Sequence, residues 1–172
     1  MNDTLELMRT RRSVRKFKSE SVPTELIEKI AEAGTYAANG RNRQTPIVIA
    51  VTDKDVLERL RKTNAEIMGV DTDPFYGATA VLVVVASKEY ATYIYDGSLV
   101  MGNLMLAAHS VGVSSCWIHR AKETFEREEW KQWLKSLGLQ GEYEGIGNCA
   151  IGYVDGDYPP VIPRKGGRII FV

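Results

Sequence analysis

A run of five aliphatic residues at positions 81–85 is the feature of this sequence that most limits what the chain can fold into. The run reads Val-Leu-Val-Val-Val and lacks polar residues at alternate positions, so a strand formed from it has to be buried on both faces. Residues 96–110 are nearly all apolar or small, which indicates a central helix or one that buries a face in a partner subunit. Both segments therefore need other elements packed around them.

Helical and extended patterns alternate along the rest of the chain. Helices are predicted over residues 3–10, from Pro23 to residue 33, from Asp53 to about Met68, and over 124–137. Strands are predicted over residues 47–51, 113–118, 146–154 and 168–172, with loops at 34–45 and 69–78. Helices and strands mixed in this way indicate an α/β or α+β class.

The whole chain, residues 1–172, is predicted to form one domain. A chain of 172 residues can bury a substantial core, and no repeat, low-complexity tract or linker divides it. The segment 155–172 is distinct, because three prolines keep it extended and it ends in the apolar residues Ile169 to Val172. We expect a C-terminal arm that leaves the domain body and adds a strand to the sheet of another subunit.

The balance of charge excludes several partners. Lys and Arg together number 22, as do Asp and Glu, so the chain has no net field that would attract nucleic acid or an anionic membrane. The longest apolar run, residues 80–86, is too short to span a bilayer, and the N-terminal residues lack the pattern of a signal peptide. Cys116 and Cys149 lie in apolar segments and form no CxxC pair, which favours buried, reduced thiols. We expect a cytoplasmic protein with no nucleic-acid or membrane partner.

Six basic residues within ten positions form the densest charge in the chain. They are Arg9, Arg11, Arg12, Arg15, Lys16 and Lys18, and Ser13 lies among them. Arginine donates hydrogen bonds to phosphate through a planar, bidentate group, and a serine hydroxyl can add another donor. A solvated basic surface has the same composition, so the run alone leaves both interpretations open.

Other segments carry weaker signals. Residues 145–150 match a loose dinucleotide-binding pattern, but a strand-like run continues past them, which favours close packing of their glycines. His109 lies on the apolar helix and is predicted to be packed in a core or an interface. His119 follows a predicted strand, where polar residues often face a ligand crevice. No histidine, cysteine or carboxylate lies at the spacing of a metal site, and no serine lies in a nucleophile elbow.

Four stretches, taken together, resemble the FMN-dependent nitroreductase family. They are Arg11-Arg-Ser-Val-Arg-Lys-Phe17, the loop from Ala37 to Pro46, Phe75-Tyr-Gly-Ala78, and the segment from Asp96 to Ile118. Their order and spacing cover nearly the whole chain. The resemblance implies an α+β fold with a mixed sheet flanked by helices, in an intertwined homodimer that exchanges C-terminal strands and holds two FMN molecules at its interface.

The resemblance also implies roles for particular residues. Non-covalently bound FMN would be contacted by Arg11, Arg12, Ser13, Arg15, Asn39, Gly40, Asn42, Gln44, Trp117, Ile118, His119, Arg164 and Lys165. Within this set, Asn39, Gly40 and Asn42 would reach the flavin from the partner chain. The chain departs from relatives at Ile162, where lysine is common, and at His119-Arg120, where a carboxylate or glycine pair is common.

The activity that the resemblance implies is ping-pong reduction of a small acceptor, such as a nitroaromatic or quinone, with NAD(P)H as the donor. The flavin carries the chemistry, so no catalytic side chain is expected. Tyr36, Phe75 and Tyr76 are candidates for the substrate face, although Phe75 and Tyr76 could equally be core aromatics. The alternatives are a flavin carrier or sensor without turnover, and a flavoenzyme acting on an enone or a halogenated ring.

Overall fold

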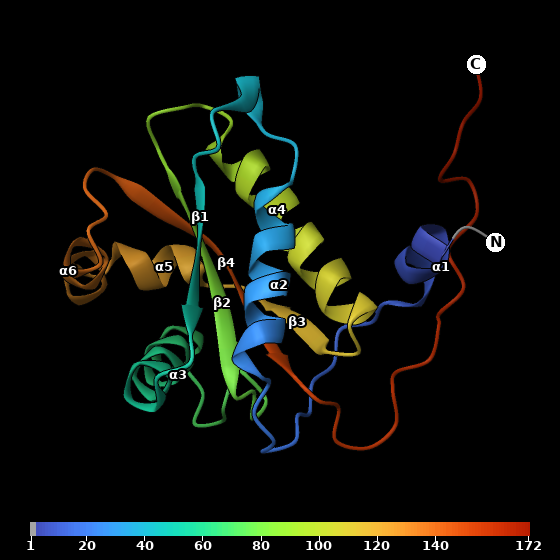
Figure 1. The fold of residues 1–172 in the computed structure, drawn as a ribbon, viewed down its shortest axis with the longest axis horizontal. Helices are drawn as coiled ribbons and strands as arrows, with labels where there is room; N and C mark the ends of the chain where they lie inside the picture. Colours follow the sequence, from blue (N-terminus) through green and yellow to red (C-terminus); the bar gives the residue numbers. More distant parts are fainter. Residues whose placement is uncertain (1–2) are drawn as a thin grey trace.

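The computed structural model describes residues 3–172, in which a four-stranded sheet has helices on both faces (Figure 1). The elements in chain order are α1 (Asp3–Thr10), α2 (Thr24–Thr35), the 3-10 turn η1 (Gly40–Asn42), β1 (Pro46–Val51), α3 (Lys54–Met68), β2 (Ala80–Ser87), α4 (Tyr93–Ser110), β3 (Ser114–Ile118), α5 (Ala121–Glu126), α6 (Glu128–Ser136) and β4 (Tyr143–Gly152). The α+β class is confirmed. No helix in the described part of the chain is both long and apolar enough to cross a membrane.

The strands lie in the order β1-β2-β4-β3, and each neighbouring pair is antiparallel. The sheet is therefore antiparallel within the described chain, and the expectation of a mixed sheet was wrong. The one parallel contact is an isolated bridge between Ser13 and Ser115, because the segment that carries Ser13 touches β3 at a single position.

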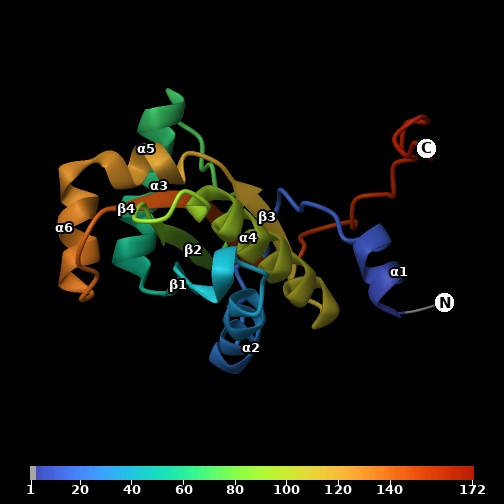
Figure 2. The ribbon, with the colours of Figure 1, turned by 90° about the horizontal axis from the view of Figure 1, so that it is seen from above.

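Strand β2 is buried on both faces, as its sequence predicts. Val81, Val83 and Val85 face one hydrophobic cluster, which is covered by α3, α5 and α6. Leu82 and Val84 face the second cluster, which is covered by α2 and α4. Figures 1 and 2 show these two helical layers on opposite sides of the sheet. Since side chains alternate along a strand, an uninterrupted aliphatic run supplies both cores at once.

The helix predicted over residues 124–137 is instead two helices. Arg127 is extended, with φ −73° and ψ 139°, and separates α5 from α6. Its guanidinium Nη1 lies 2.6 Å from Glu66 Oε2 on α3. The break allows Phe125 and Trp130 to meet edge to face with ring centroids 5.8 Å apart, both fully buried. A continuous helix follows from the local pattern, but packing against α3 and the sheet decides otherwise.

The glycines of strand β4 serve close packing, as the sequence suggests. A Cβ atom on Gly145 would lie 2.2 Å from the carbonyl oxygen of Ala121, so only glycine lets α5 begin against this strand. A Cβ atom on Gly147 would lie 2.6 Å from Nε1 of Trp117. The segment is thus a central strand rather than a dinucleotide-binding turn.

Helix α1 and the C-terminal arm project from the domain body on the same side (Figures 1 and 2). Helix α1 buries no residue, and Leu5 and Met8 are about half exposed. The predicted strand at residues 168–172 is absent from this single chain, where the segment is irregular and Ile169, Ile170 and Phe171 are 78% to 93% exposed. Within residues 3–172 no neighbouring strand lies there to pair with it.

Candidate functional site

The basic segment is held against the sheet by its apolar residues. Val14 is buried, and its amide donates to the carbonyl of Ser115 on β3 at 3.0 Å. Phe17 is also buried, and its amide donates to the carbonyl of Tyr76 at 3.1 Å. Arg15 lies between these two anchors and is exposed. Because buried apolar residues lie on either side of the cation, its positive charge is held on a backbone that is fixed to the sheet.

Three donors of this segment gather around Cys116 on β3. Burial raises the pKa of the Cys116 thiol, while the charge of Arg15, a hydrogen bond with Ser13 and the charge of Arg11 oppose that rise. Nη1 of Arg11 is buried and has no hydrogen-bond partner within residues 3–172. An unpaired buried guanidinium nitrogen is costly, so it marks a place where an anionic ligand would be stabilised. The donor set of Arg11, Ser13 and Arg15 fits the phosphate and pyrimidine edge of FMN.

Arg12 does not share this arrangement. Its Nε donates to the carbonyl of Pro160 at 3.2 Å, and its Nη1 donates to the carbonyl of Arg11 at 2.5 Å. Its amide donates to the hydroxyl of Tyr158 at 2.8 Å. In this chain Arg12 therefore holds the C-terminal arm, and its expected contact with phosphate stays a prediction.

His109 joins the basic segment, α4 and the arm. Its Nε2 lies 2.9 Å from Oγ1 of Thr10, and its Nδ1 lies 3.3 Å from the hydroxyl of Tyr158. The Tyr158 ring stacks on the imidazole at 5.7 Å between centroids. Burial, together with the charges of Arg11 and Arg12, lowers the pKa of His109. The position is a packed contact, as its place on an apolar helix suggests.

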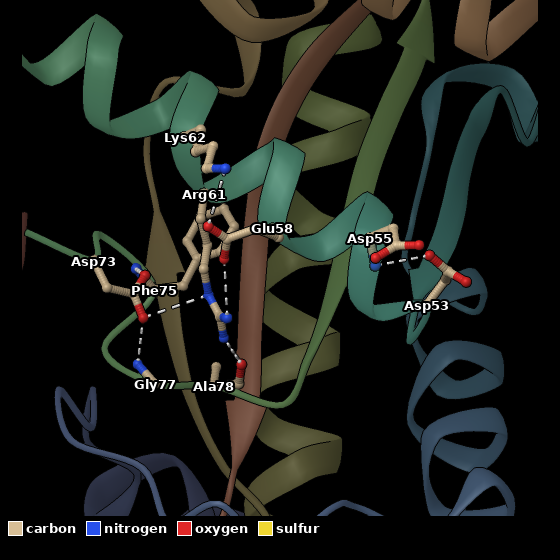
Figure 3. Close-up of polar contacts among 9 residues, drawn as sticks. All are labelled: Asp53, Asp55, Glu58, Arg61, Lys62, Asp73, Phe75, Gly77 and Ala78. Carbon is tan, nitrogen blue, oxygen red and sulfur yellow. Dashed lines mark hydrogen bonds and ion pairs between the residues drawn. The ribbon is translucent and has the colours of Figure 1, made fainter.

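A second support reaches the basic segment from α3 through the loop 73–78 (Figure 3). The carboxylate of Asp73 accepts hydrogen bonds from the amides of Phe75 at 2.8 Å and Gly77 at 2.7 Å. Arg61 pairs with Asp73, with Nε 3.4 Å from Oδ2, and donates to the carbonyl of Ala78. These contacts fix the Tyr76 carbonyl that receives the amide of Phe17.

The expectation that Phe75 lines a substrate face was wrong. Phe75 is fully buried in the cluster beneath α3, because its amide is fixed by Asp73 and its ring turns inward. Tyr76 is half-buried and takes a left-handed φ of 58°. The positioning pair Arg61–Asp73 was not predicted, although Asp at the start of a Pro- and Gly-containing turn is the usual signal of such a cap.

The loop 39–44 has a fixed conformation of its own. Oδ1 of Asn39 accepts from the amide of Gln44 at 2.9 Å, and Nε2 of Gln44 donates to Oδ1 of Asn42 at 3.2 Å. The amide of Gly40 donates to the buried carboxylate of Asp96 at 2.9 Å. Gln44 thus supports the loop, and its expected contact with FMN stays a prediction. Asp96 anchors the loop to α4, a role that was not predicted from the sequence.

The expected flavin ligands of the loop 39–44 and those of the basic segment lie at opposite ends of α4. The loop 39–44 meets the helix at Asp96, whereas the basic segment meets it at His109. These two positions lie about 20 Å apart along the helix axis. Tyr36 belongs to the first group: it is 78% exposed and borders a depression together with Asn39, Asn42 and Gln44. One chain does not bring the two groups together.

The end of β3 and the C-terminal arm carry the remaining candidates. Trp117 is half-buried, and its Nε1 lacks a hydrogen-bond partner within the described residues. The side chain of Ile118 is buried in the opposite face of the sheet, so only its backbone can approach a ligand. His119 is exposed, and Arg120 follows with a left-handed φ of 70°. Arg164 and Lys165 lie exposed on the arm, a few residues beyond Pro160.

Residues 8–153 match the model of the nitroreductase family. The chain belongs to the nitroreductase family. It is 30% identical over 142 residues to a putative NADH dehydrogenase/NAD(P)H nitroreductase of Archaeoglobus fulgidus, an alignment that covers 80% of this chain and 76% of the relative. It is 31% identical over 118 residues to a similarly named protein of Methanothermobacter thermautotrophicus, covering 67% of this chain but only 60% of that relative.

Solved nitroreductases share the fold over the full chain. A nitroreductase with bound FMN from Bacteroides fragilis superposes with a TM-score of 0.90 at 28% identity, covering 100% of both chains. A nitroreductase with bound FMN from Desulfitobacterium hafniense superposes with a TM-score of 0.87 at 27% identity, covering 100% of this chain and 99% of the other.

Proposed function

We propose that this nitroreductase binds FMN non-covalently and works as an NAD(P)H-dependent oxidoreductase. The unpaired buried Nη1 of Arg11, beside Ser13 and Arg15, is the observation that carries the proposal. The FMN in the two similar crystal structures supports the identity of the ligand. The names of the relatives support a nicotinamide donor, since they include an NADPH-flavin oxidoreductase of Vibrio harveyi.

The division of the site across α4 supports a homodimer. A stripe at Tyr95, Leu99, Gly102 and Leu106 follows helical spacing along α4. Tyr95 and Leu99 are 71% and 50% exposed, and Gly102 and Leu106 are half-buried. Two α4 helices packed antiparallel through this stripe would bring Asn39, Gly40 and Asn42 of one chain to the basic segment of its partner. Arg164 and Lys165 on the arm would then close on the phosphate.

FMN, when bound, supplies the two-electron chemistry. The chain would bind its phosphate through Arg11 and Ser13, and Arg15 would place positive charge at the pyrimidine edge, where negative charge develops on reduction. The backbone of Ile118 and the side chains of Trp117 and His119 would border the reacting face. We propose a nitroaromatic or quinone as the acceptor, with Tyr36 and Tyr76 as candidates for contacting it.

The alternatives are a flavin carrier without turnover and an enzyme acting on an enone or halogenated ring. Absorbance of the purified protein during NADH and NADPH titration separates them. Bleaching of the flavin that reverses with a quinone or nitroaromatic supports the proposal. Flavin that never bleaches indicates a carrier, and bleaching that reverses only with an enone or halogenated ring indicates the second alternative.

The double variant Arg11→Ala/Arg15→Ala tests the assignment of the phosphate site. Loss of two charge-assisted donors is expected to weaken FMN binding by roughly 100-fold or more. Fluorescence titration of the flavin-free protein measures the dissociation constant. Lys54→Ala/Lys62→Ala removes two charges from the distant α3 and should leave binding unchanged. Equal affinity of the two double variants would refute the assignment.

A further inference from the structure

The loop 39–44 carries two cations whose charges no carboxylate balances. Arg41 and Arg43 are exposed, and neither has an ion-pair partner within residues 3–172. Five other basic residues of the described chain do form ion pairs, as Arg127 does with Glu66 at 2.6 Å. Two unpaired guanidinium groups two residues apart form a local site for a highly charged anion.

The backbone holds these two cations in place at a cost. Arg41, Asn42 and Gln44 all have left-handed φ values, of 54°, 53° and 53°. Residues other than glycine rarely adopt this backbone conformation, and clusters of such residues are found at ligand sites. Asp96 holds the loop through the Gly40 amide and also accepts from Oγ1 of Thr92 at 2.8 Å. These contacts hold the loop, and with it Arg41 and Arg43, in one position on α4.

An aromatic ring completes the arrangement. The guanidinium carbon of Arg43 lies 3.8 Å from the centroid of the Tyr90 ring. This stacking orients the planar group while its N–H edges stay free to donate. Together with Arg41 they border a depression of about 300 Å³, whose other lining residues are Gly40, Ala91 and Thr92. These lining residues include no carboxylate, so a phosphate monoester there would meet two guanidinium groups and an aromatic face.

We infer that Arg41, Arg43 and Tyr90 bind the 2′-phosphorylated adenosine of NADPH and make this nitroreductase prefer NADPH over NADH. The inference rests on the proposed function, which places Asn39, Gly40 and Asn42 of the same loop beside a flavin. A nicotinamide stacked on that flavin would leave its adenosine end to be bound by neighbouring residues. The 2′-phosphate is the one group that separates the two donors, and bidentate arginines recognise it best.

The double variant Arg41→Gly/Arg43→Met is designed to keep the loop folded. Glycine accepts the left-handed backbone at residue 41, and methionine keeps an apolar stack on Tyr90. We expect KM for NADPH to rise roughly 10- to 100-fold, the loss typical of hydrogen bonds to a charged group, while KM for NADH changes less than about twofold. Lys54→Ala/Lys62→Ala, which removes the same charge from α3, should change neither value.

Competition against NADPH in the FMN-loaded protein identifies the ligand. Adenosine 2′,5′-bisphosphate should compete roughly tenfold or more better than 5′-AMP, and the double variant should lose this difference. Competition by inorganic phosphate equal to that of the bisphosphate, or an unchanged NADPH-to-NADH ratio in a variant that retains FMN, overturns the inference. A wild-type protein that neither binds FMN nor oxidises either nucleotide refutes the proposed function instead, and this inference with it.

Discussion

Arg11 and Arg12 are neighbours in sequence, yet their side chains take different roles. Arg12 binds the carbonyl of Pro160 on the arm, whereas Nη1 of Arg11 is buried without a partner. Burial of Val14 between β3 and the core sets which cations turn inward. The apolar residues of the basic run thus give its cations different roles: Arg12 is structural, whereas Arg11 is a candidate ligand.

The protonation of His109 should make stability depend on pH. Its pKa is lowered from the usual 6.5, because burial and the charges of Arg11 and Arg12 disfavour a second cation there. Below about pH 6.5 the unfolded chain takes up a proton that the folded chain resists, so stability falls with pH in this window. Thermal unfolding of the flavin-free protein between about pH 8 and pH 5.5 should show a larger decrease for the wild type than for His109→Gln. An imidazole titration by NMR at or above 6.5 would contradict the assigned cause.

At the scale of elements, helix α3 and the loop 73–78 carry the basic segment through a chain of contacts. Arg61 on the helix pairs with Asp73, and Asp73 fixes the turn (Figure 3). The turn presents the Tyr76 carbonyl to the amide of Phe17. The candidate phosphate site is thereby supported from the face of the sheet opposite to α4. Support of this kind sets the position of the donors without touching the ligand.

Substitution of two aspartates distinguishes an effect on protein stability from an effect on the support of the FMN site. Asp73→Ala removes two amide hydrogen bonds and an ion pair, so we expect about 2–3 kcal/mol of lost stability and weaker FMN binding. Asp53→Ala removes only the N-cap of α3, which accepts from Asp55 and Val56 at 3.0 Å, and should cost about 1 kcal/mol. Urea unfolding and flavin titration measure both effects. Equal flavin affinity in the two variants would show that the loop does not support the site.

At the scale of the whole molecule, the C-terminal arm is the part whose apolar residues and backbone find few packing partners in a single chain. Its last residues are strongly exposed and unpaired by any strand of the described chain, although Tyr158 and Pro160 tie its beginning to Arg12. An exposed apolar segment of this length is typical of an interface. The homodimer would bury both the arm and the partly exposed stripe of α4.

Truncation after Val154 should therefore weaken the dimer. Removal of residues 155–172 deletes the apolar arm together with Arg164 and Lys165, so both subunit association and FMN affinity are expected to fall by roughly tenfold or more. Sedimentation over a range of protein concentrations measures the dimer fraction. Truncation after Gly167 removes only the final apolar residues and should have an intermediate effect. A dimer of unchanged stability after the longer truncation would refute arm exchange.

The sequence by itself determined the features that depend on local pattern. Composition and period predict the aliphatic run of β2, the apolar helix α4 and the start of α3 at Asp53, and each appears in the structure. They also predict the basic segment. Only the tertiary structure decided that Phe75 is core, that a helix breaks at Arg127 and that Arg12 meets Tyr158, 146 residues away. It also decided that the candidate ligands lie at opposite ends of α4. These features depend on contacts between distant segments, and a local period carries no information about which distant segments will meet.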